Sequence, residues 1–329
     1  MSDNTDHIPS LAHLGPQWFT PVLGWSGLAL AWHRGAEHFG PTALLVSRTC
    51  VGIAAAIFML VTLASLIRAR RYPAAFRADF SHPIRHGFAA AFPISILLLS
   101  TNALLHGGAR NWIEPLWLLG VVLLFGVTAW VISRWMGGRV AWPSITPVLY
   151  IPVVGTIIVP LAAAPLGYQA TGWFFFAIGA FFWPILTALV LIRSAHQPMP
   201  APLLPSWFIT IAPPAVGGLS AVGLGMPDTV LPAALGLAAL AAVSCAIRVP
   251  QLFNTPFGMP AWATSFPMAA FSALSLRTAS SVGAISMLSI ALLAITTVLI
   301  IGLSLATLKG LRNGLLLLPE PAPIPVKAA

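Results

Sequence analysis

Charged residues are scarce in this sequence. Only 7% of the 329 residues are charged and 58% are hydrophobic, whereas a typical soluble domain has about 25% charged residues. A soluble fold of this size could not bury so much apolar surface, so the excess must face lipid. The composition therefore excludes an ordinary soluble protein and predicts an integral membrane protein.

Cysteine is also scarce, and the N-terminal residues lack the features of a secretory signal. The two cysteines, Cys50 and Cys245, lie within apolar runs, so no disulfide framework is expected. Residues 1–16 contain Asp3 and Asp6 and have neither a basic start nor an early apolar run. We expect the protein to insert into the membrane through its own spans.

The chain is basic, with 16 basic and 7 acidic residues and a net charge of +9. Basic proteins often bind nucleic acid. Here, however, the charges stand singly at the ends of apolar runs. The predicted partner is therefore membrane lipid and not nucleic acid.

Long apolar runs occupy nearly the whole sequence. A membrane-spanning helix needs roughly 20 apolar residues, and ten runs are suitable: 17–36, 43–67, 86–106, 113–136, 145–165, 171–193, 207–225, 229–247, 259–277 and 281–308. The predicted fold class is all-α integral membrane, with ten transmembrane helices. A single transmembrane pore domain at 17–310 would then lie between a short tail at 1–16 and another at 311–329.

Basic residues gather on one side of these runs. Twelve lie at or beyond the ends of the even runs: Arg68, Arg70, Arg71, Arg77, Arg85, Arg134, Arg139, Arg193, Arg248, Lys309, Arg312 and Lys327. The other side has only Arg34, Arg48, Arg110 and Arg277. Because basic loops stay in the cytoplasm, both termini are predicted to be cytoplasmic. The expected location is the cell membrane, which in a bacterium is the inner membrane.

The odd runs share an internal proline that the even runs mostly lack. These prolines recur every 54 to 72 residues, and each following even run ends in a basic residue; they are Pro21, Pro93, Pro152, Pro213 and Pro267. Repeats of this length indicate an array built from one supersecondary unit. The sequence thus predicts five helical hairpins, each with a proline-containing helix first.

Proline inside a helix removes a backbone donor and frees a carbonyl group. In lipid an unpaired carbonyl costs several kcal/mol, so such a kink is tolerated only within protein or beside a wet cavity. We therefore expect the five proline-kinked odd helices to form an inner pore ring with the even helices outside. Prolines are also simply frequent in membrane helices, which is the competing explanation.

Asp, Glu, Lys and Arg are missing from the middle of every predicted span. Ion-coupled carriers and pumps usually keep such a group there to bind the driving ion. No span holds a hydrolase, metalloprotease or Cys/His metal motif. The sequence therefore predicts no catalytic residue, no metal site and no cofactor, and the protein is not expected to be an enzyme.

A neutral pore of this kind would favour anions only weakly. Helix N-termini attract negative charge, and basic residues at both mouths raise the local anion concentration. The residues that precede the five prolines would lie at one depth; they are Thr20, Phe92, Ile151, Ala212 and Phe266. Hydrophobic constrictions can close a pore by excluding water, so the two phenylalanines are candidate gates, although either could be a packing residue.

Several short motifs carry a family resemblance. They are WFTPVLG at 18–24, SHPIRHGF at 81–88 followed by FPIS, SRWMGG at 133–138, PVLYIP at 147–152 and WATSFPMAAFS at 262–272. In their order and placement, over about residues 14–310, the chain resembles the tellurite-resistance/dicarboxylate transporter family, which includes the plant guard-cell slow anion channels.

The resemblance implies ten helices as five hairpins around a central pore, usually in a homotrimer with one pore per subunit. It implies that Phe266 occludes the pore and that Phe92 is a second pore-facing aromatic. It also places His82 and Arg85 in a family-like motif before the third helix. These two residues could serve an inner vestibule or simply start the helix and contact headgroups.

Two functions follow from these observations. The first is an anion channel that passes chloride, nitrate or similar small anions passively, with Phe266 and Phe92 as its gate. Its lining would include the inner-helix prolines and their neighbours: Thr20, Pro21, Pro93, Ile151, Pro152, Ala212, Pro213 and Pro267. The alternative is a carrier or exporter of dicarboxylate, sulfite or tellurite, with a proton carried by His33 or His82.

Overall fold

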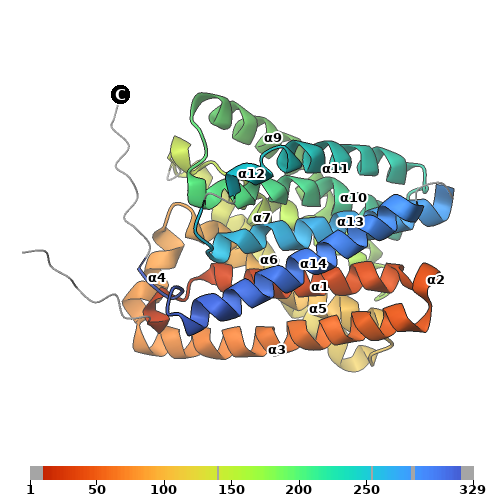
Figure 1. Cartoon of the computed structure of the whole chain (residues 1–329), viewed down its shortest axis with the longest axis horizontal. Coiled ribbons are helices and arrows are strands. Elements are labelled where there is room, and N and C mark those ends of the chain that lie inside the picture. The colour runs from red at the N-terminus through yellow and green to blue at the C-terminus, as the bar shows by residue number, and fades with distance from the viewer. Residues whose placement is uncertain (1–9, 139–140, 253–254, 283–285, 320–329) are drawn as a thin grey trace, which may run out of the picture.

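The structure is a computed structural model that describes residues 10–138, 141–252, 255–282 and 286–319. Within these ranges every regular element is a helix. Figure 1 shows most of the long helices running roughly along the longest axis of the molecule. Most of the tail at 1–16 and about half of that at 311–329 lie outside the described residues, as do Arg139 and Lys327.

The helices in the even runs are long and mostly exposed. They are α3 (Pro41–Arg71), α6 (Arg110–Met136), α9 (Gln169–His196), α11 (Val230–Ala246) and α14 (Ser286–Arg312). In the apolar centres of α3, α6, α9 and α14, only 17–33% of residues are buried inside the protein. Because their exposed side chains are large and apolar, these faces suit contact with lipid.

The odd runs contain composite helices that start as 3-10 helix and continue as α-helix. The pairs are η2 (Pro16–Phe19) with α1 (Thr20–Arg34), η3 (Arg85–Ala90) with α5 (Ala91–Leu105), η7 (Ala201–Ile211) with α10 (Ala212–Gly223), and η8 (Met259–Thr264) with α13 (Ser265–Val282). The fifth is more broken: η5 (Pro147–Leu149), α7 (Tyr150–Val153), η6 (Val154–Ile158) and α8 (Pro160–Ala163).

Each of the five repeated prolines occupies the second or third position of an α-helical segment that directly follows 3-10 helix. The first turn of an α-helix has N–H groups without an α-helical partner, so proline costs little there. These helices are therefore irregular because each changes from 3-10 helix to α-helix close to its repeated proline. The ring of kinked helices stays a prediction.

Six helices are long and apolar enough to cross a membrane in the part of the chain that the structure describes. They are Pro41–Arg71, Arg85–Leu105, Arg110–Met136, Gln169–His196, Ala201–Gly223 and Met287–Arg312, with shorter apolar helices at Pro147–Ala163 and Val230–Ala246. An all-helical protein with several candidate spans is thus confirmed, while the count of ten stays a prediction. The remaining elements are η1 (Leu11–His13), α2 (Ala36–Phe39), α4 (Pro73–Ser81), η4 (Trp142–Ser144) and α12 (Val249–Leu252).

Helices that follow each other in the chain pack together. Contacts join α1 to α3, α5 to α6, η6 and α8 to α9, α10 to α11, and α13 to α14. The proline-containing segments also contact one another in a closed sequence: α1 with α5, α5 with η6 and α8, η6 with α10, α10 with α13, and α13 with α1. In two of them, Arg85–Leu105 and Ala201–Gly223, 67% of the central residues are buried.

The described chain begins and ends at the same end of the molecule. The backbone N–H of Ser10 donates a hydrogen bond to the carbonyl of Leu317 over 2.9 Å. If the chain crosses a membrane between these points, the number of crossings must be even. The side on which this end lies stays a prediction.

Two of the basic residues that end the even helices make equivalent contacts. Arg68 donates through Nε to the carbonyl of Ala12 (3.1 Å), and Arg193 donates through Nη2 to that of Pro143 (3.0 Å). Both carbonyls lie nine residues before the repeated proline of the same hairpin, and both arginines are 2% exposed. The first and third repeats therefore share a clamp between the end of the second helix and the start of the first.

Candidate functional site

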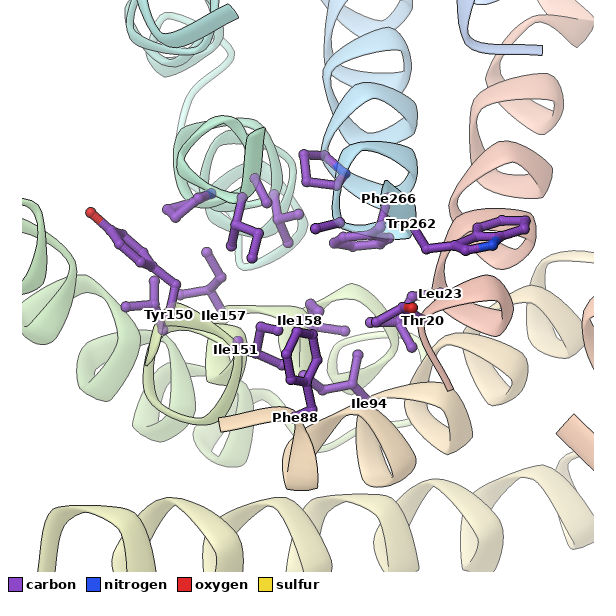
Figure 2. A pocket seen from close by; sticks show the side chains of 18 residues that line it. Thr20, Leu23, Phe88, Ile94, Tyr150, Ile151, Ile157, Ile158, Trp262 and Phe266 are labelled. Atoms are coloured by element: carbon purple, nitrogen blue, oxygen red, sulfur yellow. The ribbon is translucent and has the colours of Figure 1, made fainter. Parts of the chain in front are cut away.

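The proline-containing segments meet around one small cavity, which we call the central cavity. Its volume is about 60 Å³. All five segments contribute to its wall, which is lined by Thr20, Leu23, Phe88, Ile94, Tyr150, Ile151, Val154, Gly155, Ile157, Ile158, Ile209, Ala212, Pro213, Val216, Trp262, Ala263, Phe266 and Pro267 (Figure 2). Residues far apart in the sequence thus converge on one point.

Most of the predicted pore residues lie in this wall. Four of the five residues that precede the repeated prolines line it, namely Thr20, Ile151, Ala212 and Phe266, and so do Pro213 and Pro267. These residues therefore share one location, and their role in a pore stays a prediction. Pro21 and Pro152 are buried in the same segments but are not lining residues.

The few polar side chains in the wall form hydrogen bonds with residues outside the wall. The hydroxyl of Tyr150 donates to Thr187 Oγ1 over 2.8 Å, and the Trp262 indole donates to Thr307 Oγ1 over 2.8 Å. Thr20 Oγ1 donates to the carbonyl of Gln17 over 2.6 Å. Figure 2 shows Tyr150 directing its oxygen away from the other labelled side chains and Trp262 extending to the opposite side. The surface left facing the cavity is almost wholly apolar.

An apolar cavity of this size is unfavourable for a hydrated ion. Water needs two to four polar partners to be stably held, and hydrophobic constrictions exclude it. An anion that entered would lose its hydration without gaining protein donors, which carries a large free-energy cost. The described wall of the central cavity therefore does not suit a hydrated anion.

Phe266 lies on the side of this cavity next to α1 and is 9% exposed. Its ring packs against Gly27, where an added Cβ would lie 2.9 Å from Phe266 Cδ2 and 3.0 Å from Ala269 Cβ. One turn earlier, a Cβ on Gly24 would meet Ser265 Oγ. The two glycines let α1 and α13 approach closely enough to seat the Phe266 ring between them.

Phe92 is the exception among the five residues that precede the prolines. Its ring stacks on Phe58, with centroids 5.6 Å apart, and meets the edge of Phe19 at 5.2 Å. Phe92 and Pro93 line a second, larger hollow behind the wall of the central cavity. The structure therefore does not bring Phe92 together with Phe266.

The two predicted vestibule residues, His82 and Arg85, lie at the same end as Ser10 and Leu317. His82 Nδ1 accepts hydrogen bonds from the backbone N–H groups of Ile84 (3.2 Å) and Arg85 (3.1 Å), so this ring caps the start of η3. The Arg85 guanidinium lies 3.0 Å from Asp79 and lines the second hollow. Neither residue lines the central cavity.

Sequence reasoning missed several residues of the wall. Phe88, Ile209 and Trp262 lie four or five residues before a repeated proline, in the 3-10 part of their helices. A 3-10 helix turns every 3.0 residues and an α-helix every 3.6, so a purely α-helical register assigns the wrong face to residues before the junction. A recurring bulky apolar residue at this offset was the available signal.

Known proteins are similar to this chain over most of its length. A family model described as voltage-dependent anion channel, SLAC1, matches residues 13–308. A tellurite resistance protein TehA homolog from Haemophilus influenzae is 27% identical over 260 residues, 78% of each chain.

Two proteins named S-type anion channels from Arabidopsis thaliana are also similar. SLAH2 is 25% identical over 78% of this chain, and SLAH3 is 25% identical over 93% of it. The aligned regions cover 50% and 49% of these two proteins, so the chain spans about half the length of the plant channels.

Proposed function

The chain belongs to the SLAC1 family of voltage-dependent anion channels, and from that membership we propose that it passes small anions, such as chloride or nitrate, through the central cavity. In this proposal the five proline-containing segments form an inner ring, and Phe266 is the barrier that closes it. The exposed helices α3, α6, α9, α11 and α14 surround the ring and face lipid. Transport of anions is what the family establishes; the ring, the barrier and the choice of anions are our proposal.

The convergence of all five segments on one apolar constriction carries the proposal. A passive path needs a continuous lumen that can be closed, and the central cavity is a point that every inner segment touches. The described residues of its wall include no Asp, Glu, Lys, Arg or His, so an anion would meet no buried cation among them that binds it tightly. Selection would then rest mainly on the cost of dehydration, with basic residues at the two ends concentrating anions.

Replacing Phe266 with Ala tests the barrier. Removing the ring widens the constriction, and each 1.4 kcal/mol taken from the barrier raises the rate about tenfold. We expect chloride and nitrate flux into liposomes containing the purified variant to rise by about tenfold or more. Phe92→Ala is the matched control: it removes the same ring one position before another repeated proline, but behind the wall. An unchanged flux in Phe266→Ala at normal reconstitution would exclude Phe266 as the barrier.

A carrier of oxyanions or dicarboxylates is the second candidate, because the Haemophilus relative is named for tellurite resistance. A proton-linked carrier predicts saturable flux that follows a pH gradient. Among the described residues that line the central cavity, only Tyr150 carries an ionisable group, and its hydroxyl is hydrogen-bonded to Thr187. Flux that stays electrogenic and independent of the pH gradient would support the channel and reject the carrier.

We also propose that the protein is a homotrimer with one pore per subunit and that both termini face the cytoplasm. The trimer rests on the family resemblance alone. Cross-linking of the reconstituted protein, with subunit stoichiometry read by mass, tests it. The orientation rests on the basic residues at the end that holds Ser10 and Leu317.

A further inference from the structure

The second hollow, which we call the side cavity, lies outside the proposed permeation path. It has a volume of about 320 Å³, within the range of small-molecule sites. Its walls come from η2, α3, α4, η3, α5 and α6. Two of its lining residues are strongly exposed, Leu66 on α3 (58%) and Phe80 on α4 (41%). Since α3 and α6 present large apolar side chains outward, the side cavity lies at the surface that faces lipid.

The side cavity is apolar along most of its length and polar at one end. Phe19, Leu66, Phe92, Leu123 and Val127 supply the apolar walls. At the polar end, Asp79 lies 2.5 Å from Arg68 and 3.0 Å from Arg85. Such a hollow matches a molecule with one hydrocarbon chain and a compact head that contains oxygen.

A buried histidine defines the chemistry of that head. His86 is 2% exposed and lines the side cavity, and its Nε2 atom has no partner among the described residues. Its Nδ1 lies 2.9 Å from the carbonyl of His82. A carbonyl only accepts, so Nδ1 carries the hydrogen and Nε2 of the neutral ring is left as an acceptor. The missing partner is therefore a donor.

A second orphan polar atom lines the same hollow. Thr62 Oγ1, on α3, is buried and has no hydrogen-bond partner in the described part of the chain. A buried polar group without a partner is destabilising, because it has lost its hydrogen bonds to water. A hydroxyl can donate to His86 Nε2, and another can accept from Thr62. We propose that the side cavity binds a single-chain amphiphile with a hydroxyl-bearing head, of the monoacylglycerol class.

The side cavity shares a wall with the central cavity. Three pairs of consecutive residues face opposite ways: Phe19, Ala89 and Pro93 line the side cavity, while Thr20, Phe88 and Ile94 line the central one. Filling one side of a close-packed wall shifts the other side, because protein interiors transmit strain. The bound amphiphile would therefore modulate anion flux; this second part rests on the proposed function, whereas the binding itself does not.

Photolabelling tests the site. The probe is a monoacylglycerol with a diazirine on its acyl chain, added to the full-length protein in phospholipid nanodiscs, with labelled peptides mapped by mass spectrometry. We expect saturable labelling of peptides that contain Thr62–Ala69 and Leu123–Val127. Unlabelled monoolein should compete, and dioleoyl phosphatidylcholine should not. Labelling that does not saturate, or that the phospholipid suppresses equally, would show ordinary boundary lipid and overturn the proposal.

Matched variants separate the cavity from the lipid-facing surface. Val127→Trp places a bulky ring in the side cavity, whereas Val122→Trp adds the same ring to the lipid-facing side of α6, where Val122 is 67% exposed. We expect labelling to fall about tenfold in the first, equivalent to about 1.4 kcal/mol, and to stay unchanged in the second. Thr62→Val should weaken labelling, while Thr49→Val, on an exposed part of the same helix, should not. Equal labelling in all four variants would refute the site.

The flux measurement then tests the coupling. Monoolein should change chloride flux in wild-type liposomes and have no effect in Val127→Trp. If labelling is saturable but flux does not respond, the coupling through the shared wall is wrong and the binding site stands. If Phe266→Ala also carries no flux, the proposed function itself has failed.

Discussion

At the scale of single residues, the most informative side chains are the few charged ones that the fold buries. Arg68 and Asp79 are 2% and 4% exposed, and Arg68 also donates to the carbonyls of Ala12 and Ala75. Through these bonds one guanidinium holds α3, α4 and the residues before η2 together. Burying such a pair costs free energy because both charges lose their hydration. Removing one partner costs more, because the remaining charge is left buried without a counter-charge.

Asp79→Asn should therefore destabilise the protein strongly. It leaves the buried Arg68 without its counter-charge, for which we expect a loss of about 3–5 kcal/mol, read as a large fall in thermal unfolding temperature in detergent. Asp228→Asn is the control, because the Asp228–Arg277 pair is 25–45% exposed and should contribute about 0–1 kcal/mol. Similar shifts in both variants would contradict the importance of burial.

Gly27 gives a second residue-level prediction. A methyl group there would press on Phe266 Cδ2 and Ala269 Cβ, and overpacking of this kind costs about 1–3 kcal/mol. We expect Gly27→Ala to lower thermal stability in the wild type and to cost clearly less in the Phe266→Ala background, where one of the two clashes is gone.

Gly52→Ala is the control for this cycle. No atom lies within 4 Å of a Cβ at that position of α3, so the change should be neutral or slightly stabilising through helix propensity. An equal penalty for Gly27→Ala in both backgrounds would show that the Phe266 ring does not rest on this glycine.

At the scale of elements, α14 is held to its neighbours by hydroxyl groups. Trp25 donates to Ser304 Oγ (3.2 Å), Trp32 to Thr297 Oγ1 (3.1 Å) and Trp262 to Thr307 Oγ1 (2.8 Å). Lipid tails are as apolar as the helix surfaces, so close packing and such hydrogen bonds hold helices together in a membrane. The orientation of α14 thus depends on a minority of polar positions within a strongly apolar helix.

Removing these acceptors should loosen α14 while leaving it apolar enough to cross a membrane. Intramembrane hydrogen bonds average about 0.6 kcal/mol, so the triple variant Thr297→Val, Ser304→Ala and Thr307→Val should lose about 2 kcal/mol in thermal stability. Ser244→Ala on α11 removes a hydroxyl that bonds only within its own helix and should have little effect. A triple variant as stable as the wild type would mean that packing alone positions α14.

The second feature at this scale is the composite helices, in which α-helix follows 3-10 helix. Each repeated proline lies near the start of an α-helical segment, just after a 3-10 segment. Proline costs little there, because the first turn of an α-helix has N–H groups without an α-helical partner; the kink itself stays a prediction. The change of helix type also turns the residues before the junction, and Phe88 and Trp262 among them line the central cavity.

At the scale of the whole molecule, the bond between Ser10 and Leu317 places both ends of the described chain together. Labelling with an impermeant maleimide tests which side they face. In a background with Cys50 and Cys245 replaced by Ala, we expect Asn313→Cys and Arg77→Cys to be labelled only from the cytoplasm. Glu37→Cys and Asn111→Cys should be labelled only from outside. Labelling of all four from one side would refute the arrangement.

The sequence by itself determined the broad class of this protein. Sparse charge, long apolar runs and repeated prolines were sufficient to predict an all-helical membrane protein, and four of the five residues before those prolines do line one cavity. These features depend on hydrophobicity and backbone chemistry, which are local properties.

Only the tertiary structure decided which side chains meet. Phe92 and Phe266 hold the same position in the repeat, yet Phe92 packs with Phe19 and Phe58 behind the wall while Phe266 faces the cavity. The sequence pattern likewise did not predict the buried Arg68–Asp79 pair or the side cavity. Their partners come from separate elements, and their contacts depend on how whole helices pack, a property that no local pattern encodes.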